Sequence, residues 1–121
     1  MDKLKYIEIA QKTAINHCGV SKQLDKWREE VYELEDALNK FENFEESGSQ
    51  DELKRKEFIK DIELELSDVY NMCGQLEKIF KFTHTSILDN MHFKMKRTMV
   101  VIEKELEADQ REQSWTNSRH E

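Results

Sequence analysis

The sequence predicts an all-α protein, and three of its features indicate this class. The 121-residue chain has no proline and only three glycines, so few positions interrupt a helix. Charged residues make up 37% of the chain, and Glu, Lys, Leu and Gln are abundant whereas strand-forming residues are sparse. Apolar residues also recur at helical spacing in four successive segments. A chain of this size has a small core, and we expect a four-helix, bundle-like fold whose copies associate.

The first two predicted helices are separated by a glycine. Residues 2–17 form the first helix, and Gly19 ends it because glycine readily adopts the left-handed conformation found at helix C-termini. Ser21 is expected to cap the second helix, which continues to Glu45. The apolar seam of this helix has spacings that alternate between three and four residues, as helix packing requires. The seam consists of Leu24, Trp27, Val31, Leu34, Leu38 and Phe41.

The third predicted helix follows a polar break. Residues 46–50 interrupt the apolar pattern and are expected to form an exposed loop. Asp51 is a suitable cap for the third helix, which continues to Phe82. Gly74 lies inside this helix and indicates either a close packing contact or a bend.

The fourth predicted helix follows a second break at residues 83–86. Ser86 and Asp89 match a capping box at its start. Its inward positions are expected to be Leu88, Met91, Met95, Met99, Ile102 and Leu106. Residues 1–108 therefore form the predicted domain, and the polar residues 109–121 are expected to be a flexible tail.

Composition and charge exclude several classes of partner. The net charge of −7 argues against nucleic acid or an anionic membrane as the main partner, although a bound metal would still allow a small anionic ligand. No apolar run approaches the roughly 20 residues of a membrane span, and the N-terminal segment lacks the apolar core of a signal peptide. Cys18 and Cys73 are expected to be reduced thiols. These features predict a cytoplasmic protein.

One position of the third helix departs from the helix's own pattern. Its seam alternates spacings of four and three residues, and six of the seven seam positions are apolar. The apolar six are Phe58, Ile62, Val69, Met72, Leu76 and Ile79. The seventh is Glu65, and a carboxylate in a packing seam is costly unless it is paired, protonated or bound to a metal. Asp61 and Asp68 share its edge of the helix, so the three acids repel one another.

The second helix carries a matching pair of acids, Glu30 and Glu33, beside its own seam. Two neighbouring helices then each offer two carboxylates three residues apart, and these form an oxygen cage suited to Mg²⁺ or Mn²⁺. In a chain with 26 acidic residues such pairs also arise by chance, so a solvated acidic face remains an alternative for this pair. A di-iron bundle would require histidine three residues after glutamate, and Glu33 and Asp68 stand there instead.

Three segments resemble a known family. Residues 22–34 resemble the EExxE-L motif of MazG-like and dimeric dUTPase-like pyrophosphohydrolases, and residues 65–69 resemble their ExxD-V motif. Residues 93–98 resemble the basic stretch that follows in MazG-like proteins. The resemblance covers residues 20–102, and it departs from the family at Tyr32, where many members carry glycine.

The resemblance implies a MazG-type fold that works as a homodimer or homotetramer. It implies Mg²⁺-dependent hydrolysis of a nucleoside triphosphate between its α- and β-phosphates, which gives the monophosphate and pyrophosphate. The implied metal ligands are Glu30, Glu33, Glu65 and Asp68. Glu29 matches the first acid of the motif and is expected to orient water, so the implied catalytic residues are Glu29, Glu30 and Glu65.

Five further side chains are candidates for substrate binding. Asn71 is placed to contact the sugar or a metal-bound water. Lys94 and Arg97, one turn apart, either clamp the triphosphate or stay solvated. Gln23 either reads the edge of the base or is a surface amide, and Trp27 either stacks on the base or packs in the core.

A non-catalytic helical oligomerisation or interaction module is the competing prediction. The heptad-like spacing of two helices favours it. Glu65 within a seam opposes this prediction, because an unpaired acid destabilises a seam that serves only packing.

Overall fold

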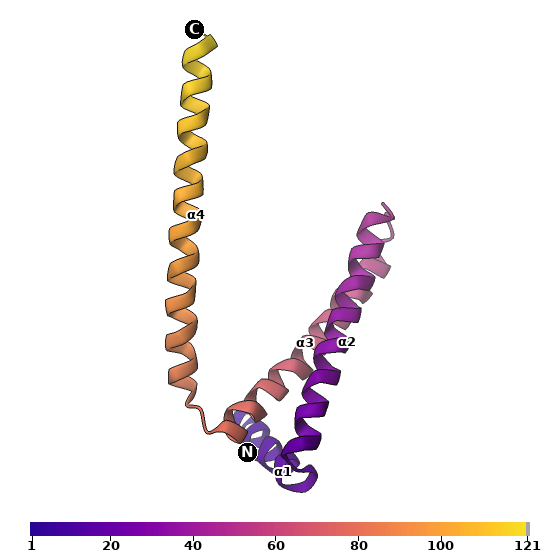
Figure 1. Cartoon of the computed structure of the whole chain (residues 1–121). Helices are drawn as coiled ribbons and strands as arrows, with labels where there is room; N and C mark the ends of the chain where they lie inside the picture. Colours follow the sequence, from indigo (N-terminus) through magenta and orange to yellow (C-terminus); the bar gives the residue numbers. More distant parts are fainter. Residues whose placement is uncertain (121) are drawn as a thin grey trace. The chain divides into compact units, whose positions relative to one another are not determined.

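The structure is a computed structural model that describes residues 1–120, with the side chains of residues 1–116. Within this range the chain is helical and has no strand, which confirms the predicted all-α class (Figure 1). The helices are α1 (Lys3–Cys18), α2 (Val20–Glu46), α3 (Glu52–Phe80) and α4 (His84–His120). None of these helices, over the part described, is both long enough and apolar enough to cross a bilayer.

The chain divides into two compact units, Met1–Lys81 and Phe82–Glu121. The first unit contains α1, α2 and α3, each of which contacts the other two. The second unit is built on α4 alone. The observed division therefore lies just before α4, whereas the sequence analysis placed a boundary after residue 108.

The α2–α3 hairpin is the largest packed element of the first unit. Phe58 of the α3 seam packs against Phe44 of α2, with ring centroids 5.3 Å apart and ring planes tilted by 45°, and the Arg55 guanidinium lies 5.7 Å from the centre of the Phe41 ring. On α3 the predicted seam is withdrawn from solvent along its whole length, with Met72 buried and the other six positions, Glu65 included, half-buried. The hairpin therefore places the acidic position of the α3 seam against α2.

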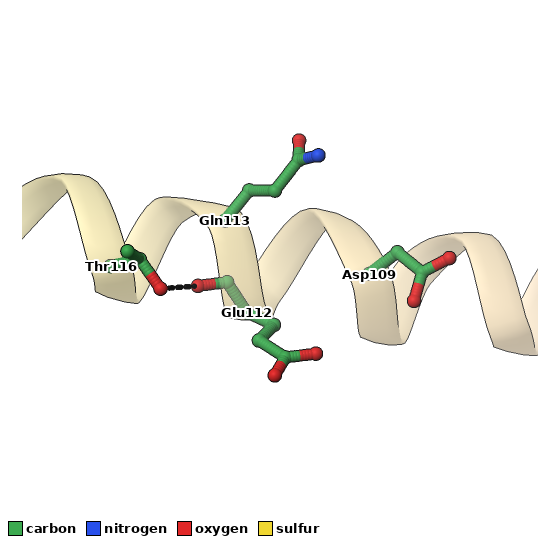
Figure 2. Close-up of a pocket in the computed structure, with 4 residues that line it drawn as sticks. All are labelled: Asp109, Glu112, Gln113 and Thr116. Atoms are coloured by element: carbon green, nitrogen blue, oxygen red, sulfur yellow. Dashed lines mark hydrogen bonds between the residues drawn. The ribbon is translucent and has the colours of Figure 1, made fainter.

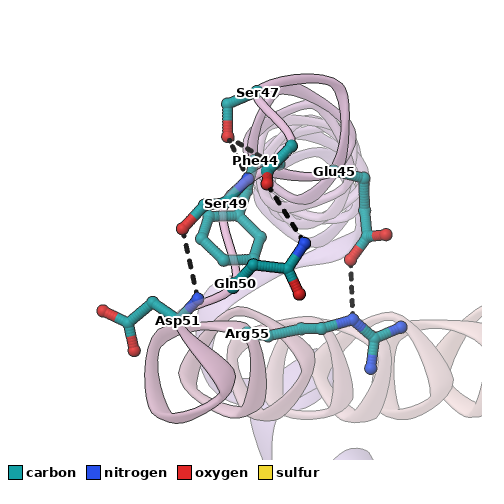
Figure 3. Close-up of polar contacts among 8 residues, drawn as sticks. Phe44, Glu45, Ser47, Ser49, Gln50, Asp51 and Arg55 are labelled. Carbon is teal, nitrogen blue, oxygen red and sulfur yellow. Dashed lines mark hydrogen bonds and ion pairs between the residues drawn. The ribbon is translucent and has the colours of Figure 1, made fainter.

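The loop between α2 and α3 is held by its own polar groups (Figure 3). The Asp51 backbone N–H donates to Ser49 Oγ at 3.3 Å, and the Ser49 N–H donates to Ser47 Oγ at 3.3 Å. Arg55 Nε donates to Glu45 Oε1 at 2.6 Å and so ties the first turn of α3 to the last turn of α2. The predicted cap is confirmed, because Asp51 Oδ1 accepts the Lys54 N–H at 3.1 Å.

Helix α1 packs against the open end of the hairpin, and Gly19 alone links it to α2. Gly19 has φ 86° and ends α1 as predicted, with its N–H donating to Ile15 O at 2.9 Å. Ser21 does not cap α2: the helix begins at Val20, so Gly19 is the capping residue of both helices. Because a single residue links the two helices, Ser21 lies inside the first turn of α2 and not at the position that caps the helix.

Gln11 of α1 forms hydrogen bonds with two residues of α3. It is buried, its Oε1 accepts from Lys78 Nζ at 2.7 Å, and its Nε2 donates to Asn71 Oδ1 at 3.5 Å. A Cβ at Gly74 would lie 2.6 Å from both amide atoms of Gln11, so the Gln11 amide would have to move to admit a side chain there. The close packing contact, rather than a bend, therefore explains Gly74.

Helix α4 begins earlier and ends later than expected. Thr83 Oγ1 accepts the Ser86 N–H at 3.1 Å, so Thr83 rather than Ser86 caps the helix. The helix continues to His120, past the predicted end at residue 108, because no glycine or proline interrupts residues 109–120. Figure 2 shows residues 109–116 as regular helix, with Thr116 Oγ1 donating back to Glu112 O at 2.9 Å.

Candidate metal centre

The hairpin brings four carboxylates together. Glu30 and Glu33 come from α2, and Glu65 and Asp68 come from α3. One oxygen of each carboxylate lies within 4.8 Å of the chosen oxygen of every other. The structure thus gathers the four residues that the sequence analysis singled out as metal ligands, and we refer to them as the acid cluster.

Helix geometry explains why the four acids meet. Residues three apart lie about 60° apart around a helix and one turn apart along it, so each pair projects from one edge of its helix. The hairpin is antiparallel and its loop is short, so the edge of α2 that carries Glu30 lies level with the edge of α3 that carries Glu65. Two local i, i+3 patterns and one tight turn are sufficient to form the cluster.

Two carboxylate oxygens of the cluster are buried and have no hydrogen-bond donor. They are Glu30 Oε2 and Glu65 Oε2. Glu30 as a whole is only 7% exposed. Burying a carboxylate oxygen without a donor costs free energy, and a bound cation is one of the few groups that offsets this cost. A solvated acidic face would not bury the oxygens of Glu30 and Glu65 in this way, whereas Glu33 is half-buried and Asp68 is exposed.

Lys26 supplies the only ion pair found for the acid cluster among the described residues. Its Nζ lies 3.0 Å from Glu30 Oε1 and 3.7 Å from Glu29 Oε2. The hydrogen bond to Glu30, and the charges of Glu30 and Glu29, raise the pKa of Lys26. Glu29, expected to orient water, has a largely exposed carboxylate that pairs with Lys26, and it is not one of the four acids that the structure gathers.

The crowding of acids changes the proton affinity of Glu33. The negative charge of Glu30 is the main cause that raises the pKa of Glu33, followed by desolvation, a hydrogen bond with Glu30, and the charges of Glu65 and Glu29. The negative charge of neighbouring acids favours the protonated form of a carboxyl group, and a cation that binds there must displace this proton. The raised pKa of Glu33 is therefore a consequence of the other acids lying close to it.

The size of the cluster suits a hard divalent cation. Oxygens on opposite sides of one Mg²⁺ are about 4.2 Å apart, twice the bond length of about 2.1 Å, and for Ca²⁺ the corresponding span is about 5 Å. The observed spread of 4.8 Å lies between these values. Four carboxylates gathered within this distance are compatible with one hard divalent cation.

A hollow of about 450 Å³ lies next to the cluster, where α1, α2 and α3 meet. Gln23 lines it and donates from Nε2 to Ala14 O at 3.3 Å, while Lys22 and Lys26 also border it. Trp27 is half-buried in the α2 seam and does not line this hollow; its indole Nε1 is buried without a partner. Of the two candidates on α2 for contact with a base, Gln23 is therefore the better placed.

The sequence analysis did not identify Gln75, which lines the same hollow. Gln75 is 7% exposed, and its buried Oε1 has no donor. It stands next to Leu76 of the α3 seam and three residues after buried Met72. The sequence signal for Gln75 was a polar residue next to an apolar seam. Interpreting that signal required the position of α1, the third helix that this residue faces.

A smaller hollow of about 170 Å³ lies along the hairpin on the loop side of the cluster. Glu33 and Glu65 form one end of it, and Tyr32, Asp61 and Lys40 also line it. Lys40 Nζ pairs with Asp36 Oδ2 at 2.9 Å, which partly balances the acids there. Tyr32, the position at which the chain departs from the MazG-like pattern, thus borders the cluster.

Three other predicted substrate contacts lie away from these hollows. Asn71 accepts a hydrogen bond from Gln11 and so faces α1. Lys94 and Arg97 belong to the second unit, where they line a shallow hollow of about 270 Å³ on α4 together with Thr98 and Val101. Their role as a triphosphate clamp stays a prediction.

Comparisons with known proteins add no family assignment. No protein-family model, no curated protein and no solved structure matches the chain. The functional interpretation therefore rests on the acid cluster, its burial and the hollows beside it.

Proposed function

We propose that the chain is a Mg²⁺-dependent nucleoside triphosphate pyrophosphohydrolase that releases the monophosphate and pyrophosphate. The observation that carries this proposal is the acid cluster, in which Glu30 and Glu65 bury carboxylate oxygens that no donor satisfies. The two acidic motifs on α2 and α3, which resemble those of MazG-like enzymes, support it. A scaffold would gain stability by replacing these acids with apolar residues, so a ligand explains them better.

In this proposal Glu30, Glu33, Glu65 and Asp68 would hold the cation. Mg²⁺ supplies neutralisation of phosphate charge and activation of the attacking water. Glu29, whose exposed carboxylate pairs with Lys26, would accept a hydrogen bond from the attacking water and orient it. Lys26, which borders the hollow and pairs with Glu30, would bind a phosphate oxygen.

The hollow between α1, α2 and α3 is where we place the base of the nucleotide. Its lining combines apolar groups with the amides of Gln23 and Gln75, a composition that suits a flat heterocycle with polar edges. Lys26 borders this hollow and also lies 3.0 Å from Glu30 of the acid cluster, as expected for a residue that contacts the phosphates. A nucleotide in this position would reach the cation with its phosphates.

The test is pyrophosphate release across a panel of nucleoside triphosphates with Mg²⁺, using the wild-type chain, Glu65→Gln and Glu63→Gln. Glu65→Gln is expected to abolish release because it removes a ligand charge while keeping the shape of the side chain. Glu63 lies on the same helix but is exposed and paired with Lys60 at 2.7 Å, so Glu63→Gln is the matched control and should keep wild-type turnover. Wild-type turnover in Glu65→Gln would contradict the assignment of the site.

A non-catalytic association module remains the second candidate. The large apolar side chains exposed along α4 favour it. Thermal melts separate the two proposals: the enzyme is stabilised by Mg²⁺ with a non-hydrolysable nucleotide, whereas a pure association module melts at the same temperature with and without them.

A further inference from the structure

We propose that Trp27 is a positioning residue of the acid cluster, whose indole N–H donates a hydrogen bond to Glu30 Oε2 when the cluster holds its cation. This role rests on the proposed function, since it requires a cation in the cluster. Two buried polar atoms of opposite type, a donor and an acceptor, carry the assignment. They lie about one helical turn apart in sequence on α2, and neither has a partner among the described residues.

Trp27 has a buried donor without an acceptor. The side chain is half-buried in the α2 seam, and its Nε1 is withdrawn from solvent and bonds to no described residue. The side chain does not line the hollow between the three helices, so the indole is not placed to stack on a base there. A buried N–H without an acceptor destabilises a fold, so this donor requires another explanation.

Glu30 has the complementary atom. Its Oε2 is buried without a donor, whereas its Oε1 lies 3.0 Å from Lys26 Nζ. Side chains on an α-helix lean towards its N-terminus, and the pairing with Lys26 shows that the carboxylate of Glu30 leans over the turn that holds residues 26 and 27. Residues three apart have Cβ atoms about 5–6 Å from one another, so a rotation of the carboxylate or of the indole can join the donor to the acceptor.

Two other buried acceptors lack a donor, and both belong to the facing helix α3. They are Glu65 Oε2 and Gln75 Oε1. Glu65 borders the hollow on the loop side of the cluster together with Glu33, whereas Trp27 lies on the side away from the loop. Gln75 is a neutral amide, and a carboxylate accepts a stronger hydrogen bond than a neutral group does. Position and charge therefore favour Glu30 as the acceptor.

A neutral donor supports a metal ligand in a different way from a charged one. The ammonium of Lys26 balances the charge of Glu30 and so competes with a cation. The indole N–H fixes the direction of the carboxylate and leaves its charge in place. Hydrogen bonds to carboxylates that bind a metal strengthen the binding by about 10- to 100-fold. Trp27 and Lys26 should therefore have opposite effects on cation affinity, although they are adjacent in the sequence.

Calorimetric titration of Mg²⁺ into the nucleotide-free, full-length chain tests this role. Trp27→Phe keeps an aromatic ring in the seam and removes the N–H, so the Kd for Mg²⁺ should rise about 10-fold. Trp115→Phe makes the same exchange on α4, at a side chain that is exposed, and is the matched control whose Kd should equal that of the wild type. A wild-type Kd in Trp27→Phe would overturn the positioning role alone. Absence of Mg²⁺ binding in the wild type would instead overturn the proposed metal centre, and the positioning role with it.

The indole proton gives a second readout, which leaves Trp27 unchanged and which a purely packing role would not move. The chain has two tryptophans, so in Trp115→Phe the indole N–H signal of Trp27 stands alone in a ¹H–¹⁵N correlation spectrum. Saturation with Mg²⁺ should move this proton downfield and slow its exchange with water, as a new hydrogen bond to a carboxylate does. An unchanged signal at saturating Mg²⁺ would contradict the proposal. Loss of the shift on adding Gln75→Leu, with Mg²⁺ still bound, would assign the bond to Gln75 and overturn the assignment to Glu30.

Discussion

Lys26 Nζ lies 3.0 Å from Glu30 Oε1, one helical turn away on α2, and Glu30 is the most buried member of the acid cluster. The ammonium group therefore balances part of the charge of Glu30 in the metal-free protein. A divalent cation in the cluster and the ammonium of Lys26 both carry positive charge and both draw on the same carboxylate. Each consequently weakens the binding of the other to Glu30.

Replacing Lys26 by methionine should strengthen cation binding. Met keeps the apolar stem of the side chain and removes the charge that competes with the cation, so the Kd for Mn²⁺ or Mg²⁺ should fall about 3- to 10-fold at low salt. Isothermal titration calorimetry of the cation into the nucleotide-free protein measures this change. Lys54→Met, on an exposed residue near the start of α3, is the control and should leave the Kd unchanged. A higher Kd in Lys26→Met would show that Lys26 supports the carboxylates that bind the cation rather than competing with the cation.

The same variant should impair the reaction with substrate. If Lys26 moves from Glu30 to a phosphate oxygen, Lys26→Met raises KM or lowers kcat even though the cation binds more tightly. In this variant we expect the affinity for the cation to rise and kcat/KM to fall. Parallel changes in the two quantities would indicate that Lys26 acts only through the metal ligands.

Cation binding should strengthen as pH rises through the acidic range. The neighbouring acids raise the pKa of Glu33, so this carboxyl group keeps its proton to a higher pH than a free glutamate does. A raised carboxyl pKa in the folded state stabilises the metal-free protein below the ordinary pKa of the group, and this contribution is lost as pH rises through the raised value. A cation must displace the same proton, so the increase in Tm that Mg²⁺ causes should be smaller at about pH 5 than at about pH 7.5. Differential scanning fluorimetry at matched ionic strength measures this increase in Tm at each pH.

Glu33→Gln supplies the control for this pH dependence. The variant has no proton to release at that position, so its response to Mg²⁺ should be weaker at every pH and should change less between about pH 5 and 7.5. An unchanged pH dependence in Glu33→Gln would assign the titration to another group.

Glu65→Gln should change stability in opposite directions with and without the cation. In the metal-free protein Glu65 Oε2 is buried without a donor among other acids, so neutralising the side chain should stabilise the fold by about 1 kcal/mol. With saturating Mg²⁺ the variant should be less stable than the wild type, because it has lost a ligand. Urea unfolding followed by circular dichroism in EDTA and in Mg²⁺ gives both values. A variant that is less stable in EDTA as well would mean that Glu65 makes a structural contact that its burial does not reveal.

The acids of the site were predictable because their signals are local. Glu65 interrupts an otherwise apolar seam, and the spacing of Glu30 and Glu33 is contained within one helical turn. The α2–α3 hairpin then needs only a short loop to join the two edges. The all-α class followed in the same way from composition and from the spacing of apolar residues.

The parts that could not be predicted depend on contacts between helices or on ends with competing caps. Ser21 and Ser86 are good capping residues by type, yet Gly19 and Thr83 take those positions because each helix begins one or more residues earlier. The role of Gln75 depends on where α1 packs, which no local pattern specifies. The continuation of α4 beyond residue 108 was missed because polarity was given more weight than the absence of helix-breaking residues.

The contact between Gly74 and Gln11 gives a prediction whose sign depends on the background. Alanine in a helix is more stable than glycine by about 1 kcal/mol, but in the wild type its Cβ would lie 2.6 Å from the Gln11 amide. That amide would have to move and give up its bond from Lys78, which lies at 2.7 Å, so Gly74→Ala should be destabilising by about 1 kcal/mol in net. In a Gln11→Ala background the obstacle is absent, and the same substitution should stabilise the protein by about 1 kcal/mol. Urea unfolding of the four proteins completes the double-mutant cycle, and a coupling free energy near zero would mean that Gln11 can leave the interface at no cost.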